Sequence, residues 1–278
     1  MVKLKADLHV QTFYSDGLMS PAEVVSEAAV NGVGVLSVTD HDCALAYPQV
    51  YELCVNKGIR AVSGIEISAY DNGVKVHTLG YNVNCGNSDF KCFLKSLFEG
   101  SLRRTEDIIF KLNKSGIRIR TEEVLNLRAS PSAPVHGMHV ARAGAAKGYA
   151  KSAFSFYSEY LASGKCAFST VGRPSPREAI EAVNASGGFT SLAHPGRIEL
   201  GAEEKLRLIS KLKDCGLCGI EGVYSAHTAK ETAYYKETAK AFNLLVTGGS
   251  DTHIKGGRKE IGTPAFFIDE ALAEKLGF

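Results

Sequence analysis

The sequence predicts an α/β protein with a barrel-like sheet and a small helical subdomain inserted after the fourth strand. Three observations lead to this fold class. Strand and helix signals alternate at both ends of the chain, the middle has helical periodicity with almost no strand signal, and the alternating parts supply roughly six to eight strands. Alternation indicates parallel βαβ units. This number of strands favours a barrel over an open sheet, although periodicity alone does not decide between them.

The N-terminal part carries the clearest element boundaries. Ser20 is a typical N-cap residue, Pro21 occupies the first helical position, and Glu23 follows at the third position, as in a capping box. The segment Asp-Asn-Gly at residues 71–73 is typical of a hairpin turn between two apolar segments. The expected elements are a helix at residues 21–31 and strands at residues 2–9, 33–39, 59–69 and 74–81.

The middle of the chain interrupts the alternation, and the C-terminal part resumes it. Helical periodicity over residues 88–169, broken by a Pro-rich piece at 130–134, predicts the inserted subdomain. The barrel domain is therefore expected at residues 1–87 and 170–278. Helices are expected at residues 90–114, 121–128, 138–147 and 153–162 in the insertion and at 176–186, 202–214 and 228–241 after it, with strands at 189–193, 219–224, 244–248 and 265–268.

The composition is that of an ordinary globular protein and excludes several function classes. Hydrophobic residues make up 45% and charged residues 22%, and 32 basic against 30 acidic residues leave a net charge of +2. This balance argues against a strongly basic protein that coats duplex nucleic acid. No apolar run approaches the roughly 20 residues of a membrane span, and no signal-peptide pattern precedes the first strand. Seven scattered cysteines are typical of reduced thiols. We therefore expect a cytoplasmic protein that binds neither duplex nucleic acid nor membrane.

Histidines and carboxylates recur at the ends of the expected strands. In a parallel α/β barrel the C-terminal strand ends meet at one face, so these groups can converge there. Imidazole and carboxylate together suit divalent transition metals, and a set of this size would hold more than one ion, with Glu66 as a possible bridge. His9 and Gln11 share a strand face because the side-chain period is two. The set comprises His9, Asp40, His41, Asp42, Glu66, His77, His194, Asp251 and His253.

The same residues lie in motifs that resemble the PHP family, named for polymerase and histidinol phosphatase. That resemblance implies a distorted (β/α)7 TIM-like barrel. The insertion, with its segments 139–142 and 157–164, is similar to a subgroup of stand-alone phosphoesterases that act on nucleoside 3′,5′-bisphosphates or trim short RNA 5′ ends. The motifs are Asp7-Leu8-His9-Val10-Gln11-Thr12, Ser15-Asp16-Gly17, Thr39-Asp40-His41-Asp42, Gly64-Ile65-Glu66-Ile67-Ser68, Val76-His77-Thr78-Leu79-Gly80, Ala193-His194-Pro195-Gly196 and Gly249-Ser250-Asp251-Thr252-His253.

The resemblance also implies two or three divalent ions, Mn, Fe or Zn. The chain departs from the family pattern at Gln11, where the family usually has His. A Gln carbonyl oxygen is a weaker ligand for a transition metal than imidazole. The implied ligand sets are His9, Glu66 and Asp251, with Gln11 beside them; then Asp16, His41 and His253; and finally Glu66, His77 and His194.

The expected reaction is hydrolysis of a phosphate ester by water that the metal ions activate. No separate protein base is required, although Asp42 or His194 can serve in proton transfer. Fixed cations suit a phosphate substrate, and Arg offers a bidentate fork for its oxygens. The substrate-side candidates are Arg142, Arg197, Ser15 and His227.

Two alternatives stay open at the level of sequence. The enzyme can act on another small phosphoester, such as a sugar phosphate or histidinol phosphate. Alternatively, the chain is a non-catalytic binding domain whose metal site has decayed, as Gln11 hints. The CxxC at Cys215 and Cys218 has no second pair, which disfavours a zinc or redox role.

Overall fold

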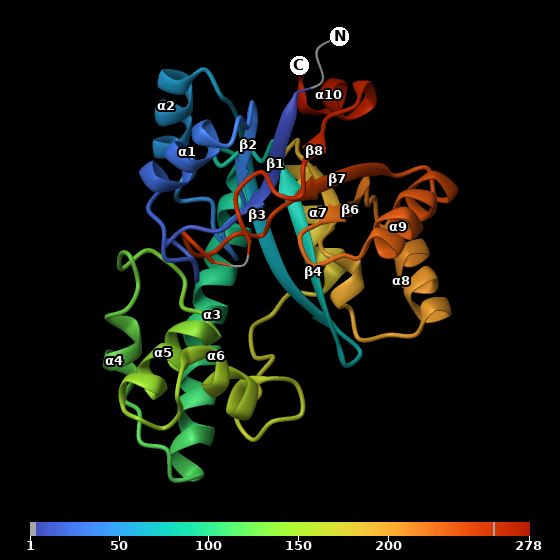
Figure 1. Cartoon of the computed structure of the whole chain (residues 1–278). Helices are drawn as coiled ribbons and strands as arrows, with labels where there is room; N and C mark the ends of the chain where they lie inside the picture. Colours follow the sequence, from blue (N-terminus) through green and yellow to red (C-terminus); the bar gives the residue numbers. More distant parts are fainter. Residues whose placement is uncertain (1–3, 258) are drawn as a thin grey trace.

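The strands form one nearly closed, barrel-like sheet. The structure, a computed structural model, describes residues 4–257 and 259–278. Its eight-stranded sheet has the order β7-β6-β5-β4-β3-β2-β1-β8 (Figure 1). The predicted fold class is confirmed. Residues 2 and 3 of the first expected strand lie outside the described residues. The strands are β1 (Lys5–Val10), β2 (Val35–Val38), β3 (Arg60–Asp71), β4 (Val74–Tyr81), β5 (Phe189–Leu192), β6 (Gly219–Tyr224), β7 (Leu245–Gly249) and β8 (Phe266–Phe267).

The sheet is only partly parallel. β1 to β3 pair in parallel, as do β5 to β7. The β3–β4 hairpin is antiparallel, with Asp71 opposite Val74, so the turn expected at residues 71–73 is confirmed. β4 also pairs antiparallel with β5, and β8 pairs antiparallel with β1. The barrel is therefore distorted at β4 and at β8.

Backbone contacts between β1 and the segment after β7 close the barrel. The carbonyl of His9 accepts a hydrogen bond from Asp251 N at 2.7 Å, and Gln11 N donates to Thr252 O at 3.0 Å. Gly249 allows this approach, since a Cβ built there would lie 2.4 Å from the Cβ of His9. Closure thus brings residues from the two ends of the sequence to one rim.

The helices around the barrel follow from local signals, with two exceptions. α1 has the expected capping box, because Ser20 Oγ accepts from Glu23 N at 3.2 Å and the Glu23 carboxylate accepts from Ser20 N at 2.7 Å. α2 and α10 were not predicted from the sequence; α2 starts after Ala46, which offers no capping side chain. These helices are α1 (Pro21–Val30), α2 (Tyr47–Lys57), α7 (Pro176–Ala185), α8 (Ala202–Asp214), α9 (Ala229–Ala241) and α10 (Glu270–Leu276).

The regular elements of the insertion after β4 are helices, as the periodicity predicts. The long helix α3 runs from the barrel into the insertion (Figure 1). Residues between Ile108 and Ala167 bury a hydrophobic cluster of their own, although the domain boundaries stay a prediction. Among the described residues, no helix has both the length and the apolar character that a bilayer crossing requires. The helices are α3 (Ser88–Lys114), α4 (Thr121–Leu125), α5 (Gly137–Ala146) and α6 (Ala153–Phe156), which continues as a π-helix at Tyr157–Leu161.

His139 in α5 is expected to make the stability of the protein depend on pH. Its side chain is buried, its Nδ1 accepts the backbone N–H of His136 at 3.0 Å, and burial lowers its pKa to about 4. The neutral form stabilises the fold fully above the ordinary value of about 6.5, and this contribution is lost as the pH falls through 4. Over that window it amounts to about 3 kcal/mol. Urea unfolding of wild type and His139→Asn at pH 7.5 and 4.0 checks this. Equal losses of unfolding free energy in the two proteins would contradict it.

Candidate metal centre

Glu66 lies at the centre of the cluster that forms at the barrel rim. It lies on β3, is fully buried, and uses both carboxylate oxygens. Its Oε2 is 3.0 Å from His9 Nε2 and 2.6 Å from Gln11 Nε2. Its Oε1 is 2.7 Å from His77 Nδ1 and 3.0 Å from His194 Nε2. One carboxylate therefore joins side chains from β1, β4 and the segment after β5.

A second group lies beside Glu66 and contains residues from three different loops. His253 Nε2 is 3.2 Å from Asp16 Oδ1, and His41 Nδ1 is 3.3 Å from Glu66 Oε2. Single ligand atoms of Asp16, His41 and His253 all lie within 4.8 Å of one another. These three residues are the second set that the resemblance implies, and His41 connects them to Glu66.

Asp251 completes the rim on the side of His9. Its Oδ1 is 3.4 Å from His9 Nε2, which also lies 3.0 Å from Glu66 Oε2, so His9 links Asp251 to Glu66. The first implied ligand set stays a prediction. Its other oxygen, Oδ2, accepts from Tyr224 OH at 2.9 Å and from Lys259 Nζ at 2.5 Å. Asp251 also has a positive φ of 54°, in the left-handed region that few non-glycine residues adopt.

The electrostatics of the cluster fit divalent cations. Burial lowers the pKa of His9, but the carboxylates of Glu221, Glu66 and Asp251 outweigh burial and raise that pKa well above its ordinary value. Burial also raises the pKa of Glu66, but the surrounding imidazoles hold it well below its usual range. Burial keeps His77 neutral by lowering its pKa.

Two buried imidazole nitrogens of the cluster make no hydrogen bond to the described residues. His77 Nε2 and His194 Nδ1 have no hydrogen-bond partner within the described part of the chain. A transition metal binds neutral imidazoles and ionised carboxylates, and its charge would displace the proton that the carboxylates attract to His9. The residues present therefore fit the metal ions that the sequence predicts, and the groups that could hold them are His9, Glu66 and His194; Asp16, His41 and His253; and His41, Glu66 and His77.

Three buried carboxylates hold the ligand-bearing segments, and the sequence analysis assigned none of them this role. Asp7 accepts from Ser250 N at 2.9 Å and Gly262 N at 2.7 Å, which fixes the segment that carries Asp251 and His253. Asp40 accepts from Thr12 N at 2.7 Å and so fixes the turn before Asp16. The third, Glu221, contacts His9 Nδ1 at 2.9 Å and accepts the backbone N–H of His194 at 2.6 Å.

The sequence does contain a signal for Glu221. It is the one charged residue in the predicted strand 219–224, and a carboxylate inside a buried strand requires strong partners. Recognising its role still needs the long-range contacts to His9 and His194, which sequence spacing does not give.

The two proton-transfer candidates lie differently. His194 belongs to the cluster, where its Nε2 faces Glu66. The carboxylate of Asp42 lies apart from the cluster: Oδ1 accepts from Ser68 N at 2.9 Å, and Oδ2 is 3.7 Å from Arg104 NH2. Its side chain thus ties the segment after His41 to β3 and to helix α3. A proton-transfer role for either residue stays a prediction.

Each of the four substrate-side candidates has a hydrogen-bond partner in the structure. Arg142, on α5, donates to the backbone carbonyl of Asp16, so the insertion reaches the cluster. Arg197 is exposed; its NH1 donates to Tyr224 OH at 3.0 Å and lies 3.6 Å from Asp251 Oδ2. Ser15 is fully buried and 2.6 Å from Asp40 Oδ1, whereas His227 accepts from Gly196 N at 3.3 Å. The substrate roles of all four stay predictions.

Lys259 and Tyr224 are two further polar groups at this rim that the sequence analysis missed. The Lys259 ammonium lies 3.0 Å from Tyr224 OH as well as against Asp251. Together with Arg197, it gives the rim two cations beside a carboxylate of the cluster. No local motif surrounds Lys259, so its place could not be read from the sequence.

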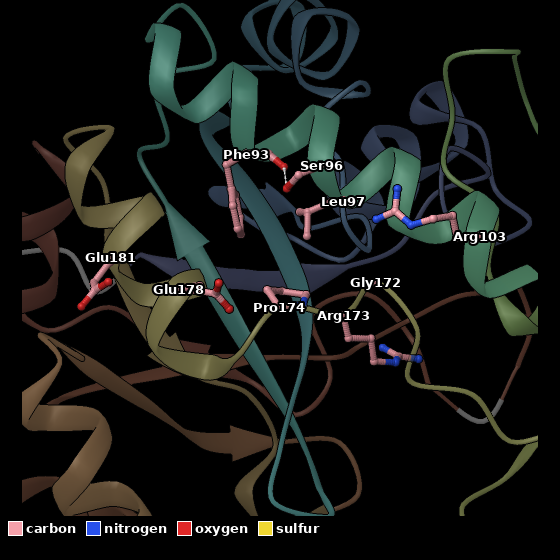
Figure 2. A pocket seen from close by; sticks show the side chains of 9 residues that line it. All are labelled: Phe93, Ser96, Leu97, Arg103, Gly172, Arg173, Pro174, Glu178 and Glu181. Carbon is pink, nitrogen blue, oxygen red and sulfur yellow. Dashed lines mark hydrogen bonds between the residues drawn. The ribbon is translucent and has the colours of Figure 1, made fainter.

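Two cavities are lined by residues outside this cluster. Figure 2 shows one of about 400 Å³ between α3 and α7, where Leu97 and Arg103 come from α3 and Glu178 from α7. The other, of about 580 Å³, lies between the segment 42–45 and α3. Neither contains a residue of the three groups that could hold metal, so their size does not identify the chemical site.

Comparisons with known proteins agree with the geometry. The PHP domain family matches residues 7–165. The chain is 33% identical to the phosphoribosyl 1,2-cyclic phosphate 1,2-diphosphodiesterase of Eggerthella lenta, over 91% of this chain and 95% of that protein. It is 28% identical to the 3′,5′-nucleoside bisphosphate phosphatase of Chromobacterium violaceum, over 92% and 90% respectively. A 5′-3′ exoribonuclease of Haemophilus influenzae is 30% identical, over 96% and 97%.

A solved structure shares the whole fold. The structure of a proposed metal-dependent phosphoesterase from Bifidobacterium adolescentis superposes with a TM-score of 0.86 at 26% identity, over 97% of this chain and 94% of that one. The match spans barrel and insertion alike, so the arrangement of the ligand-bearing strands is a shared one.

Proposed function

The chain belongs to the PHP domain family and is a phosphoesterase of the kind its full-length relatives represent, and we propose that it hydrolyses phosphate esters of small nucleotides or of short RNA 5′ ends. The observation that carries this proposal is the contact of both Glu66 oxygens with histidines from separate strands. Such a cluster has no structural need of its own, because burying so many titratable groups costs stability.

Two or three divalent ions, Mn, Fe or Zn, are the proposed cofactors. Bound ions of this kind supply Lewis acidity that activates water and neutralises phosphoryl charge. The side chains proposed to hold them are the two sets around Glu66 and the set of Asp16, His41 and His253. Glu66 orients the imidazoles of His77 and His194 through one oxygen and that of His9 through the other.

Cations at the rim support a phosphorylated substrate. Arg142 reaches the cluster from the insertion, while Arg197 and Lys259 approach from the barrel on the side of Asp251. Guanidinium and ammonium groups bind phosphate oxygens by charge-assisted hydrogen bonds. Cationic positions beside two different residues of the cluster, Asp16 and Asp251, suit a substrate with two phosphate groups, such as a nucleoside 3′,5′-bisphosphate.

A substrate panel tests the proposal. The metal-loaded full chain is incubated with a nucleoside 3′,5′-bisphosphate, a mononucleotide, a 5′-phosphorylated RNA oligomer, a phosphoribosyl 1,2-cyclic phosphate and histidinol phosphate, and released phosphate and products are measured. Hydrolysis of one of the first three, lost with a chelator and restored by Mn²⁺, supports the proposal. Hydrolysis of only the cyclic or histidinol substrate assigns another phosphoester. No hydrolysis of any of them favours the non-catalytic alternative.

The cyclic phosphate is included because of a specific observation. The relative from Eggerthella lenta is 33% identical over nearly the whole chain, and its name specifies a cyclic phosphodiester. This second candidate uses the same cluster and the same rim cations, so only the panel separates the two substrates.

Replacing Arg142 by Ala is expected to raise KM for the bisphosphate by about 10- to 100-fold, because one charge-assisted contact to a phosphate contributes about 1.5–3 kcal/mol. The measurement is steady-state kinetics on the substrate identified by the panel. Arg118→Ala is the matched control, since Arg118 is an exposed arginine of the insertion. An unchanged KM in Arg142→Ala would remove Arg142 from the substrate site.

A further inference from the structure

Gln11 lies inside the cluster with its amide orientation fixed at both ends. The side chain is fully buried between Glu66 and the segments that follow β1 and β2. Its Oε1 lies 3.1 Å from the backbone N of His41 and 2.9 Å from Ser15 Oγ. Its Nε2 lies 2.6 Å from Glu66 Oε2.

Exchanging the oxygen and nitrogen positions of the Gln11 amide would break its hydrogen bonds to His41 and to Glu66 at the same time. The backbone N–H of His41 can only donate a hydrogen bond. If the amide were reversed, the Gln11 nitrogen would replace Oε1 there, and two donors would face each other. At the other end, the amide oxygen would meet the Glu66 carboxylate, which can only accept while it is ionised. The NH2 group therefore faces the cluster.

An NH2 group in this position cannot bind a cation, because both of its hydrogens are donors and its nitrogen has no free lone pair. The first set is thereby limited to His9, Glu66 and Asp251. Both carboxylates of that set already accept from nitrogen donors, Glu66 from Gln11 and Asp251 from Lys259. Glu66 also belongs to the set with His77 and His194, but it faces those two imidazoles through Oε1, whereas Gln11 donates to Oε2.

We propose that Gln11 is a hydrogen-bond donor that fixes Glu66 and not a metal ligand, so that the chain binds two divalent ions tightly and a third only weakly. The inference rests on the proposed metal-dependent function. The tight ions would use Asp16, His41 and His253 on one side and Glu66, His77 and His194 on the other. The weak position would be the one beside His9 and Asp251.

Metal content after dialysis tests this directly. The full chain is stripped with a chelator, loaded with Mn²⁺, dialysed into metal-free buffer and analysed by mass spectrometry, and Mn²⁺ binding is followed by calorimetry. The expected result is two ions per wild-type chain. In Gln11→His, an imidazole replaces the donor, and three ions are expected. In Gln11→Leu, which has neither donor nor ligand, the number stays at two.

The outcomes separate this inference from the proposed function. Three tight ions in the wild type, or a loss of one ion in Gln11→Leu, would overturn the assignment of Gln11 while leaving metal-dependent hydrolysis intact. A wild type that keeps no ion would overturn both. Should Gln11→His fail to fold, as judged by its thermal melt, Gln11→Glu replaces it, because a second carboxylate beside Glu66 also provides a ligand and is expected to restore the third ion.

Discussion

Replacing Glu66 by Gln is expected to lower kcat by about 10³-fold or more and to remove at least one tightly bound ion. The two oxygens of Glu66 face His9, His77 and His194, and the shape of Gln is almost the same. Gln, however, carries no charge and presents an NH2 group to one side of the cluster. The measurement combines the steady-state rate on the substrate that the panel identifies with the metal content per chain.

The matched control for this prediction is Glu181→Gln. Glu181 is exposed on α7 and pairs with Arg177 at the surface, so its replacement should leave rate and metal content unchanged. A Glu66→Gln protein that retains more than about a tenth of the wild-type rate would contradict the central place of Glu66.

Local signals in the sequence were sufficient for most elements and for the location of the site. The capping box at Ser20 and Glu23 and the turn at residues 71–73 depend on neighbours in the chain, and both occur as expected. The convergence of His9 and His194 follows from one rule, that the C-terminal ends of parallel strands in a barrel meet at one face. His77 lies in the first half of the antiparallel strand β4, where this rule does not apply. Local capping and turn signals, together with one rule about barrel topology, therefore predicted most helices and strands and the rim where the candidate ligands lie.

The remaining features depend on contacts between distant segments. The antiparallel pairing of β4 with β5 joins Thr78 to Leu192 across the whole insertion, and no local pattern specifies it. Lys259 reaches Asp251 through a loop without a motif. The orientation of the Gln11 amide depends on a backbone N–H thirty residues away. Such contacts are properties of the closed barrel and not of any sequence window.

Glu221→Gln is expected to weaken Mn²⁺ binding about 10- to 100-fold at the position beside His9 and Asp251, although Glu221 belongs to none of the proposed ligand sets. Its Oε1 contacts His9 Nδ1 at 2.9 Å, and its Oε2 accepts the backbone N–H of His194 at 2.6 Å. Because a carboxylate can only accept when ionised, Glu221 places the proton of the neutral His9 imidazole on Nδ1, which leaves the lone pair of Nε2 for a metal ion between His9, Glu66 and Asp251.

Gln cannot reproduce both contacts. If its oxygen keeps the His194 N–H, its NH2 group faces His9 Nδ1, which must then accept, and the His9 proton moves to Nε2, where it blocks the ligand position. Nitrogen-15 NMR of the histidine rings should report this change of tautomer, and calorimetry the lower affinity. Glu237→Gln, at an exposed position of α9, is the control. Unchanged affinity together with an unchanged tautomer would mean that the barrel backbone alone orients His9, whereas weaker binding with an unchanged tautomer would place the effect of Glu221 on the His194 backbone.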